Sequence, residues 1–400
     1  MKSEITQNSP VGLTPYYVPV TAQANEFVPE LCKVPYDYLF RDDPVSMAEC
    51  ALLAQEYTGL DLLVANLDIY NFEAESAGAK MLFYKDHIPD VDRSNLLIKE
   101  KADLEKIKFR GLDSGRYRYL IAHQNAYTEY CGKPAFPFIC APFSLASNLY
   151  GIDNLLVSIM TEPVFAHELL RRVVEDLLIP AIRALCASLN WSGKITLADA
   201  YASAPMISPE IAEEYVERYT ELLNRELAIP GVKASSGGYW GVAELKGEDI
   251  NRFLDFKIRV GGSLSVTDPD LSSAGPRFFR EYATEKNVDL KFGISSQFLQ
   301  SANVPDIVER VREYILVGKD GPTPLALSIN SICPLTPLEN LHAAIEAVRT
   351  YGAPCAIYNK EFVMTEKRSF EEFLKEKIEN NISGYRFKWL ETSLYKSLFL

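Results

Sequence analysis

Residues 194–237 read KITLADAYASAPMISPEIAEEYVERYTELLNRELAIPGVKASSG and show the pattern that decides the fold. The runs 194–199 and 231–237 are strand-like, whereas 208–227 carries apolar side chains at helical spacing. Ser208 is a predicted N-cap and Pro209 suits the first turn of the helix. A strand, a helix and a second strand in this order predict two parallel strands joined by a crossover helix.

The same alternation runs through the whole chain. Helical patterns fill most of the gaps, most clearly at 163–189, 304–318 and 338–352. The predicted strands are 16–20, 61–66, 135–142, 194–199, 231–237, 257–266, 288–295 and 323–330. Eight strands with crossover helices predict an α/β protein with a (β/α)8 TIM barrel. A doubly wound open sheet is the alternative, but neither GxGxxG nor GxxxxGK[ST] follows any of the strands.

Three segments do not fit a simple barrel. An N-terminal extension precedes the first strand, and residues 67–134 are too long for an ordinary connection. They contain an extra strand-like run at 79–86 and a helical pattern, which predicts an inserted segment after strand 2. The charged run 369–381 predicts a helical tail. We therefore expect a barrel domain over 1–360 and a C-terminal helical extension over 361–400.

Composition narrows the class of protein. The 400 residues are 48% hydrophobic, which is enough to bury a large core. A net charge of −13 argues against binding to nucleic acids or anionic membranes, because those surfaces attract clustered lysine and arginine. Seven widely spaced cysteines without a CxxC motif are typical of reduced thiols, and neither a signal peptide nor a run of 18 apolar residues is present. We expect a cytoplasmic protein that binds no nucleic acid and no membrane.

Acidic and aromatic side chains follow the predicted strands, where TIM-barrel enzymes place their active sites. Residues 66–78, NLDIYNFEAESAG, carry three acids among aromatic residues. The candidates after predicted strands 2 to 8 are Asp68, Tyr70, Asn71, Glu73, Glu75, Phe143, Asp199, Tyr201, Tyr239, Trp240, Asp268, Gln297, Asn330, Ser331 and Cys333. An acidic, aromatic mouth with few cations fits a substrate that is aromatic or cationic, or one that needs a proton.

Each of these acids could instead have a purely structural role. Asp68 could cap the following turn, and Asp199 could accept a backbone hydrogen bond. Burial would raise the pKa of Asp199 and favour a proton-sharing role. Glu73 and Glu75 would point to opposite faces of an extended segment, so we expect at most one of them to enter the mouth.

Histidine and cysteine form no metal-binding motif. His123, His167 and His342 lie within helical patterns, where a packing or surface role is expected, whereas His87 follows the inserted strand and could approach the mouth. Cys333 lies near the mouth, but no histidine beside it could activate the thiol. HExxH, His-x-His and Cys/His clusters are absent from the sequence, so the metal content is open. Any metal should bind carboxylate oxygens, with His87 as a further candidate.

Four motifs resemble, in order and spacing, the landmarks of the uroporphyrinogen decarboxylase superfamily. They are CAPFSLASNLYG (140–151), LADAYASAPMISPEIAEEY (197–215), KFGISSQFLQSANVPDIVERVREYI (291–315) and NSICPLTPLENLHAAIEAV (330–348). The resemblance covers roughly residues 15 to 352. It implies a TIM barrel, in agreement with the strand count, and a homodimer.

Departures from the family pattern argue against two of its known chemistries. The resemblance implies arginines after strand 1 in true decarboxylases, yet TAQANEF (21–27) has none. Asp68 matches the decarboxylase aspartate, but Asn148 and Asn330 stand where a tyrosine and a histidine are expected. The coenzyme M methyltransferases of the superfamily bind zinc through His-x-Cys after strand 4 and a Cys after strand 8. LADAYAS (197–203) and Asn330 occupy those places, so that zinc site is not expected here.

The remaining resemblance is to the methyltransferases that pass a methyl group to the cobalt of a separate corrinoid protein. It implies a small O- or N-methylated donor, such as a methoxyaromatic compound, and cobalamin carried by the partner. Cobalt(I) is a strong nucleophile, but an ether oxygen leaves readily only when it is protonated or coordinated. We therefore predict that Asp68, Glu73 and Asp199 act as acids or ligands. For a methylammonium donor, Tyr239 and Trp240 would be cation–π partners.

The other candidates are assigned to substrate binding, and two other functions stay open. The predicted substrate-binding residues are Tyr70, Asn71, Glu75, Phe143, Asn148, Tyr201, Tyr239, Trp240, Asn330 and Cys333. We expect Asp68, Asp199 and Asn330 to converge on one cavity. The alternatives are a decarboxylase of the superfamily that acts on a smaller substrate, and a barrel that binds a tetrapyrrole or corrinoid without turnover.

Overall fold

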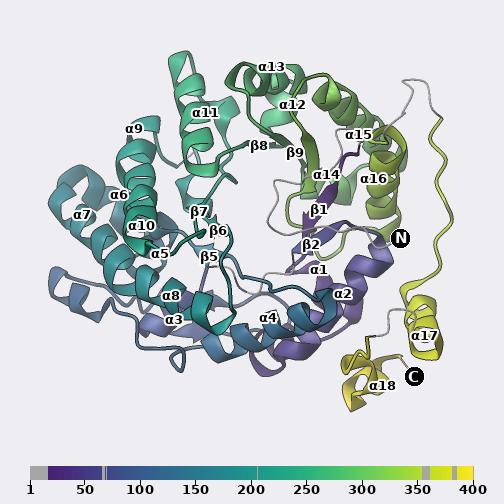
Figure 1. Cartoon of the computed structure of the whole chain (residues 1–400), viewed down its shortest axis with the longest axis horizontal. Coiled ribbons are helices and arrows are strands. Elements are labelled where there is room, and N and C mark those ends of the chain that lie inside the picture. The colour runs from purple at the N-terminus through teal and green to yellow at the C-terminus, as the bar shows by residue number, and fades with distance from the viewer. Residues whose placement is uncertain are drawn as a thin grey trace.

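A ring of parallel strands forms the centre of the protein (Figure 1). The computed structural model describes residues 17–64, 68, 70–204, 206–353, 361–380 and 385–399. Within these ranges the barrel strands are β1 (Val20–Gln23), β2 (Leu62–Val64), β5 (Ile139–Cys140), β6 (Ile195–Ala198), β7 (Ala234–Ser235), β8 (Leu264–Thr267), β9 (Leu290–Ile294) and β10 (Leu325–Ile329). They pair in the orders β2-β1-β10-β9-β8 and β5-β6-β7, and every pair is parallel. The predicted TIM barrel is confirmed.

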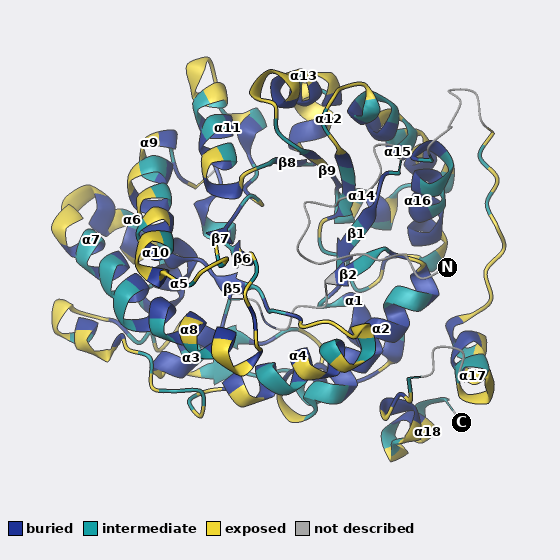
Figure 2. Cartoon of the chain, in the orientation of Figure 1, coloured by how far each residue is buried: buried dark blue, intermediate teal, exposed yellow. Residues whose placement is uncertain are grey.

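Helices surround the strands and turn their buried faces toward them (Figures 1 and 2). They are α1 (Phe27–Cys32), α2 (Pro44–Thr58), α3 (Phe72–Ala77), α4 (Tyr117–Cys131), α5 (Pro142–Tyr150), α6 (Ile152–Thr161), α7 (Pro163–Arg172), α8 (Ile179–Ser188), α9 (Pro209–Ile211), α10 (Arg218–Leu227), α11 (Glu248–Gly261), α12 (Asp270–Ala274), α13 (Pro276–Lys286), α14 (Ser296–Ser301), α15 (Val304–Lys319), α16 (Leu338–Tyr351), α17 (Phe370–Asn380) and α18 (Ser393–Phe399). Two of the predicted helices contain π-helical turns, Val173–Leu178 between α7 and α8 and Ala212–Glu217 between α9 and α10.

Strand residues alternate between the helix layer and the barrel interior. On β9, Phe292 is fully buried and its ring lies 5.9 Å from that of Tyr314 on α15. Since side chains alternate along a strand, Lys291 and Gly293 on the same strand face the interior. The lateral partners of Gly293 are Thr267 on β8 and Ser328 on β10, so these three residues share one layer of the interior.

Two of the predicted strands differ in position from the strands in the structure. β1 begins at Val20 rather than ending there, because Pro19 has no N–H to donate to a ladder. Residues 257–261 of the predicted sixth strand belong to α11, where Lys257 and Val260 are buried at helical spacing with Phe253. This helix ends at Gly261 and is capped by Gly262, whose φ of 76° is left-handed and whose N–H donates to the carbonyl of Ile258. Polar and apolar residues alternate in KIRV (257–260), as they do in a strand. The segment is helical because the residues that it buries are spaced as on one face of a helix.

The inserted segment and the helical tail are both present. In the insertion, β3 (Met81–Leu82) pairs antiparallel with β4 (Asp90–Val91) and α4 packs on α2. The tail lies outside the ring in Figure 1, and Glu49 of α2 holds it by accepting hydrogen bonds from Trp389 N (2.6 Å) and Tyr385 OH (3.0 Å). Residues 1–16 of the expected N-terminal extension lie outside the described ranges, and the boundary at 360/361 stays a prediction. None of the described helices is long and apolar enough to cross a membrane.

The interior layer leads to a stability prediction. A Cβ atom at Gly293 would lie 2.5 Å from Thr267 Oγ1 and 2.7 Å from Thr267 Cβ. We expect Gly293→Ala to lower the free energy of unfolding by about 1–3 kcal/mol, as for other overpacked sites. The control is Gly238→Ala, because a Cβ there meets nothing within 4 Å. Urea unfolding of both variants measures the difference, and equal losses would contradict the assigned layer.

Candidate active site

Three of the predicted acids gather around one buried cysteine at the C-terminal end of the strands. Cys140 ends β5, and burial raises the pKa of its thiol well above the usual value. The charges of Glu73, Asp199 and Asp68 raise that pKa further, in this order. The acids come from three segments, since Asp68 follows β2, Glu73 lies on α3 and Asp199 follows β6. The barrel therefore brings together acids that are more than one hundred residues apart.

Asp68 is buried in an ion pair with Arg116 of the inserted segment. Its other carboxylate oxygen accepts from Asn71 Nδ2. Burial raises the pKa of Asp68 to about 6, although the guanidinium of Arg116 opposes this shift. Arg116 also pairs with Glu75 (Nε–Oε2, 2.7 Å) and donates to the carbonyl of Phe40 (2.7 Å). The mouth thus contains a buried cation that the sequence analysis did not include.

Glu73 lies in the first turn of α3 and is almost completely buried. Burial raises its pKa to about 8, whereas the adjacent backbone of Cys140 opposes the shift. Its Oε2 atom has no hydrogen-bond partner among the described residues. The segment is helical and not extended as assumed from the sequence, but residues two apart on a helix also point in nearly opposite directions. Glu75 therefore turns to Arg116 while Glu73 stays inside.

Asp199 is held at the N-terminus of α5. Its Oδ1 atom accepts from Ser144 N (3.1 Å) and Ser144 Oγ (2.6 Å), and its Oδ2 atom accepts from Tyr239 OH (3.4 Å). Burial raises the pKa of Asp199, and these hydrogen bonds offset part of the rise. The resulting pKa is about 7. A carboxyl group with a pKa close to neutrality can be present as an acid and as a base at physiological pH.

A buried Lys–Asp pair supports the loop that carries Tyr239. Lys257 of α11 is fully buried and donates to the carbonyl of Tyr239 (2.5 Å). Asp270 of α12 is also fully buried and accepts from the backbone N–H groups of Gly241 (2.9 Å) and Ala243 (3.0 Å). Burial lowers the pKa of Lys257 to about 8, and the charge of Asp270 opposes this. The phenol that faces Asp199 is therefore fixed through its backbone.

The predicted substrate-binding residues differ widely in exposure. Asn71, Phe143, Asn148 and Tyr239 are buried, Tyr70, Glu75, Tyr201, Trp240 and Cys333 are half-buried, and Asn330 is exposed. Asn148 Nδ2 donates to the carbonyl of Tyr70 (2.7 Å), which ties α5 to the loop after β2. Asn330 follows β10 at the same end of the barrel, but among the described residues no hydrogen bond or ion pair joins it to the three acids. The roles of all these residues stay predictions.

Asp268, another candidate that follows a strand, binds to residues of neighbouring elements. It accepts from Tyr314 OH (2.5 Å) and Ser295 N (3.1 Å) and lies 3.4 Å from Arg310 Nη1. All three partners lie on the β9–α15 side of the barrel. This arrangement fits a structural role that joins the end of β8 to β9 and α15.

The histidines lie where their helical patterns placed them. His123 and His342 are buried, and burial lowers their pKa values to about 3 and about 4. His167 stacks on Tyr215 (4.6 Å between ring centroids), and the exposed His87 stacks on Tyr84 (3.8 Å) beside Asp86. In the described part of the chain no group of three or more His, Cys, Asp or Glu side chains is arranged to hold a metal ion.

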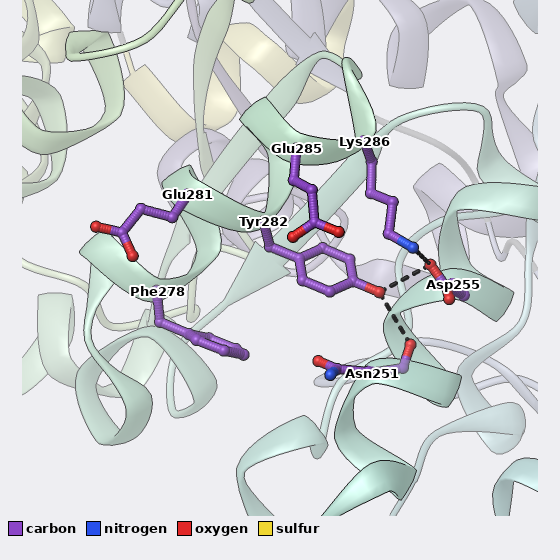
Figure 3. A pocket seen from close by; sticks show the side chains of 7 residues that line it. All are labelled: Asn251, Asp255, Phe278, Glu281, Tyr282, Glu285 and Lys286. Carbon is purple, nitrogen blue, oxygen red and sulfur yellow. Dashed lines mark hydrogen bonds and ion pairs between the residues drawn. The ribbon is translucent and has the colours of Figure 1, made fainter.

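Figure 3 shows a pocket that is formed by residues of two neighbouring helices. It lies between α11 and α13, and its lining residues are Asn251, Asp255, Phe278, Glu281, Tyr282, Glu285 and Lys286. Tyr282 OH donates to Asp255 Oδ1 (2.8 Å), and Lys286 pairs with the same carboxylate (2.6 Å). These polar groups satisfy one another, and none of the predicted site residues is among those that line the pocket. We therefore place the candidate active site at the acids around Cys140.

Three important residues were missed by sequence reasoning. Arg116 had one signal, because it continues the buried helical spacing of Leu120, His123 and Tyr127 on α4. Ser144 and Cys140 belong to the motif CAPFS, but their contacts with acids far along the chain cannot be read from local spacing.

Comparisons with known proteins agree with the barrel fold. Residues 12–233 match the family described as Uroporphyrinogen decarboxylase (URO-D). The methylated-thiol–coenzyme M methyltransferase of Methanosarcina mazei is 25% identical over 319 residues, which are 78% of each chain. A solved structure of a methyltransferase from Methanosarcina mazei shares the fold, with a TM-score of 0.67 and 19% identity over 84% of this chain and 95% of that chain.

Burial of Glu73 predicts a pH dependence of stability. Its pKa rises from 4.5 to about 8 on folding, so the folded state keeps a proton that the unfolded state releases between these values. Stability falls with rising pH wherever the folded state binds more protons. Between about pH 5 and about pH 8, wild type should therefore lose more stability than Glu73→Gln, by at most about 1.4 kcal/mol per pH unit. Urea unfolding across this range tests it, and parallel curves would show that Glu73 is ionised in the folded protein.

Proposed function

Because the chain belongs to the uroporphyrinogen decarboxylase family, we propose that it is a methyltransferase that moves a methyl group from a small O- or N-methylated donor to a corrinoid protein. The methyltransferase names of both Methanosarcina mazei relatives support the reaction class. The observation that carries the proposal is the grouping of Glu73, Asp199 and Asp68 around Cys140 at the C-terminal end of the barrel. A methoxyaromatic compound fits as the donor because its oxygen leaves more easily with a proton.

Asp199 is the leading candidate for the proton donor. Its pKa near 7 matches a group that must give up a proton at neutral pH and take it back. Ser144 and Tyr239 fix its orientation. Glu73, with a pKa of about 8, is protonated at neutral pH and is the second candidate. Asp68 shares its charge with Arg116, so we assign it to organising the site more than to proton transfer.

Aromatic and polar groups near Asp199 are suited to hold the donor. Tyr70 is half-buried, and its pKa is raised by burial and then by Cys140 and Asp199. The ring of Tyr201 lies 5.9 Å from the Arg93 guanidinium. The backbone of Trp240 is fixed by a hydrogen bond from its main-chain N–H to Ser203 Oγ (3.3 Å). Flat aromatic surfaces next to an acid fit a methoxyaromatic donor, and the ring of Trp240 would also accept a methylammonium group.

The rim of the mouth fits contact with a corrinoid protein. Met206, which follows β6, is 39% exposed, and Leu335, which follows β10, is 75% exposed. Exposed apolar side chains on the rim can cover the edge of a large macrocycle. A reduced corrinoid supplies the nucleophile that accepts the methyl group, and the chain's own residues hold the donor and deliver the proton. The cytoplasmic location and the homodimer stay predictions.

The direct test is methylation of the partner. The purified protein is incubated with a reduced corrinoid protein and with phenolic methyl ethers, methylamines or methyl thioethers, and the absorption of the corrinoid is followed. We expect a change of its absorption with at least one ether or amine. A corrinoid partner that is methylated by its own enzyme serves as the positive control. If that control works while all three donor classes are silent, the proposal is wrong.

Replacement of the acids predicts a pattern across donors. Asp199→Asn should lower turnover by roughly two to four powers of ten, the usual range for loss of a general acid. The loss should shrink for ethers of more acidic phenols, because less proton transfer is then needed. Glu73→Gln tests the second candidate in the same way. Glu285→Gln removes an exposed carboxyl of the pocket between α11 and α13 and should leave turnover almost unchanged.

Asp68→Asn is expected to act differently. It leaves the buried Arg116 guanidinium with one carboxylate partner instead of two, so the melting temperature should fall. Turnover per folded molecule should change by a similar factor for all donors.

For Asp199→Asn, an equal loss of turnover on donors with good and with poor leaving groups would contradict acid catalysis by Asp199.

A further inference from the structure

The interior of the barrel contains an exposed lysine. Lys291 lies on β9, between β8 and β10, and faces away from the helix layer. Its side chain is nevertheless exposed. A side chain on a central strand that faces the barrel axis can be exposed only if solvent enters the barrel. Thr196 of β6 is exposed on its strand in the same way, so the lumen is open to solvent on this side of the barrel too.

The lumen is lined with hydroxyl groups. Ser265 of β8 is the lateral partner of Lys291, and Thr267 and Ser328 flank Gly293 in the next layer. Thr267 Oγ1 is buried and has no hydrogen-bond partner among the described residues. Barrels of this type are usually filled with branched apolar side chains at these positions. Here the lumen offers hydroxyl donors beside an ammonium group.

Two more lysines lie at the N-terminal entrance of the same lumen. Lys194 and Lys233 directly precede β6 and β7, and the hydrogen bond from Ile195 N to Lys233 O (2.9 Å) places them side by side. Burial lowers the pKa of Lys194, and the charge of Lys233 lowers it further. Although solvent reaches Lys291, the barrel walls around it partly desolvate its ammonium group and lower its pKa, with the charge of Lys194 as the second cause. The three ammonium groups are therefore close enough to repel one another.

Among the residues that the structure describes, no carboxylate forms an ion pair with this cluster. Neither Lys233 nor Lys291 forms an ion pair within the described ranges, although the chain carries a net charge of −13. The nearest carboxylate along β9, that of Asp289, acts on Arg280 of α13 instead. Mutual repulsion without a carboxylate favours binding of an anion, because an anion would offset it.

We propose that the N-terminal half of the barrel lumen is a binding site for a small oxyanion with two or more negative charges, held by Lys291, Lys194 and Lys233. The hydroxyl of Ser265, the lateral partner of Lys291, adds a hydrogen bond to the oxygens. Phosphate groups and clustered carboxylates share this chemistry. The site is separate from the acids around Cys140, which lie at the opposite end of the strands. It does not depend on the proposed methyl transfer.

Calorimetric titration tests the site directly. Pyrophosphate and citrate are titrated into the full-length protein at constant ionic strength, adjusted with sodium chloride. We expect saturable binding of one anion per chain by at least one of the two, and the tighter ligand identifies phosphate or carboxylate as the preferred group. Lys291→Met should weaken this binding at least about tenfold, the loss expected for one charge-assisted hydrogen bond. Lys246→Met, which removes an exposed lysine before α11, is the matched control and should bind as wild type does.

Two results would overturn the proposal. One is the absence of saturable binding of either anion to wild type at constant ionic strength. The other is equal affinity of wild type and Lys291→Met, with both folded by circular dichroism. If Lys291→Met does not fold, Lys194→Gln at the entrance replaces it, and the same loss of affinity is required. A loss shared by Lys246→Met would show that binding depends on net charge alone and would also refute the site.

Discussion

The buried guanidinium of Arg116 is the interaction on which the mouth of the barrel depends. It pairs with Asp68 and Glu75, donates to the carbonyl of Phe40, and lies between the rings of Phe72 (4.8 Å) and Phe83 (4.7 Å). A buried cation is stable only when it is paired, so the segment after β2 and helix α3 must stay against α4. This contact turns Glu75 outward to Arg116. It leaves Glu73 on the opposite side, enclosed and without a cation.

The different states of the acids follow from this geometry. Asp68 has a guanidinium beside it, and its pKa rises only to about 6, whereas Glu73 has none and rises to about 8. Asp199 lies between them at about 7, because hydrogen bonds from Ser144 and Tyr239 offset part of the cost of burial. Three carboxyl groups at one end of the barrel thus cover the range in which protons are exchanged at neutral pH.

Much of the fold could be read from the sequence, because the strand–helix alternation repeats around the barrel. The predicted strand boundaries were wrong where the local sequence pattern differed from the packing in the folded protein. KIRV alternates like a strand, yet Lys257 and Val260 complete the buried face of α11. The site was harder to predict. Asp68, Glu73 and Asp199 stood out as acids after strands, but their partners Arg116, Ser144 and Cys140 come from other segments, and burial, which sets their pKa values, is a property of the assembled barrel.

Burial should hold Glu73 and Asp199 partly or fully protonated at neutral pH. Carboxyl carbon-13 NMR of protein labelled at Glu and Asp measures this directly, with Glu73→Gln and Asp199→Asn used to assign the signals. We expect the Glu73 signal to titrate with a pKa of about 8 and the Asp199 signal with a pKa of about 7. Titration of both groups near their ordinary values of 4.5 and 3.8 would contradict this expectation.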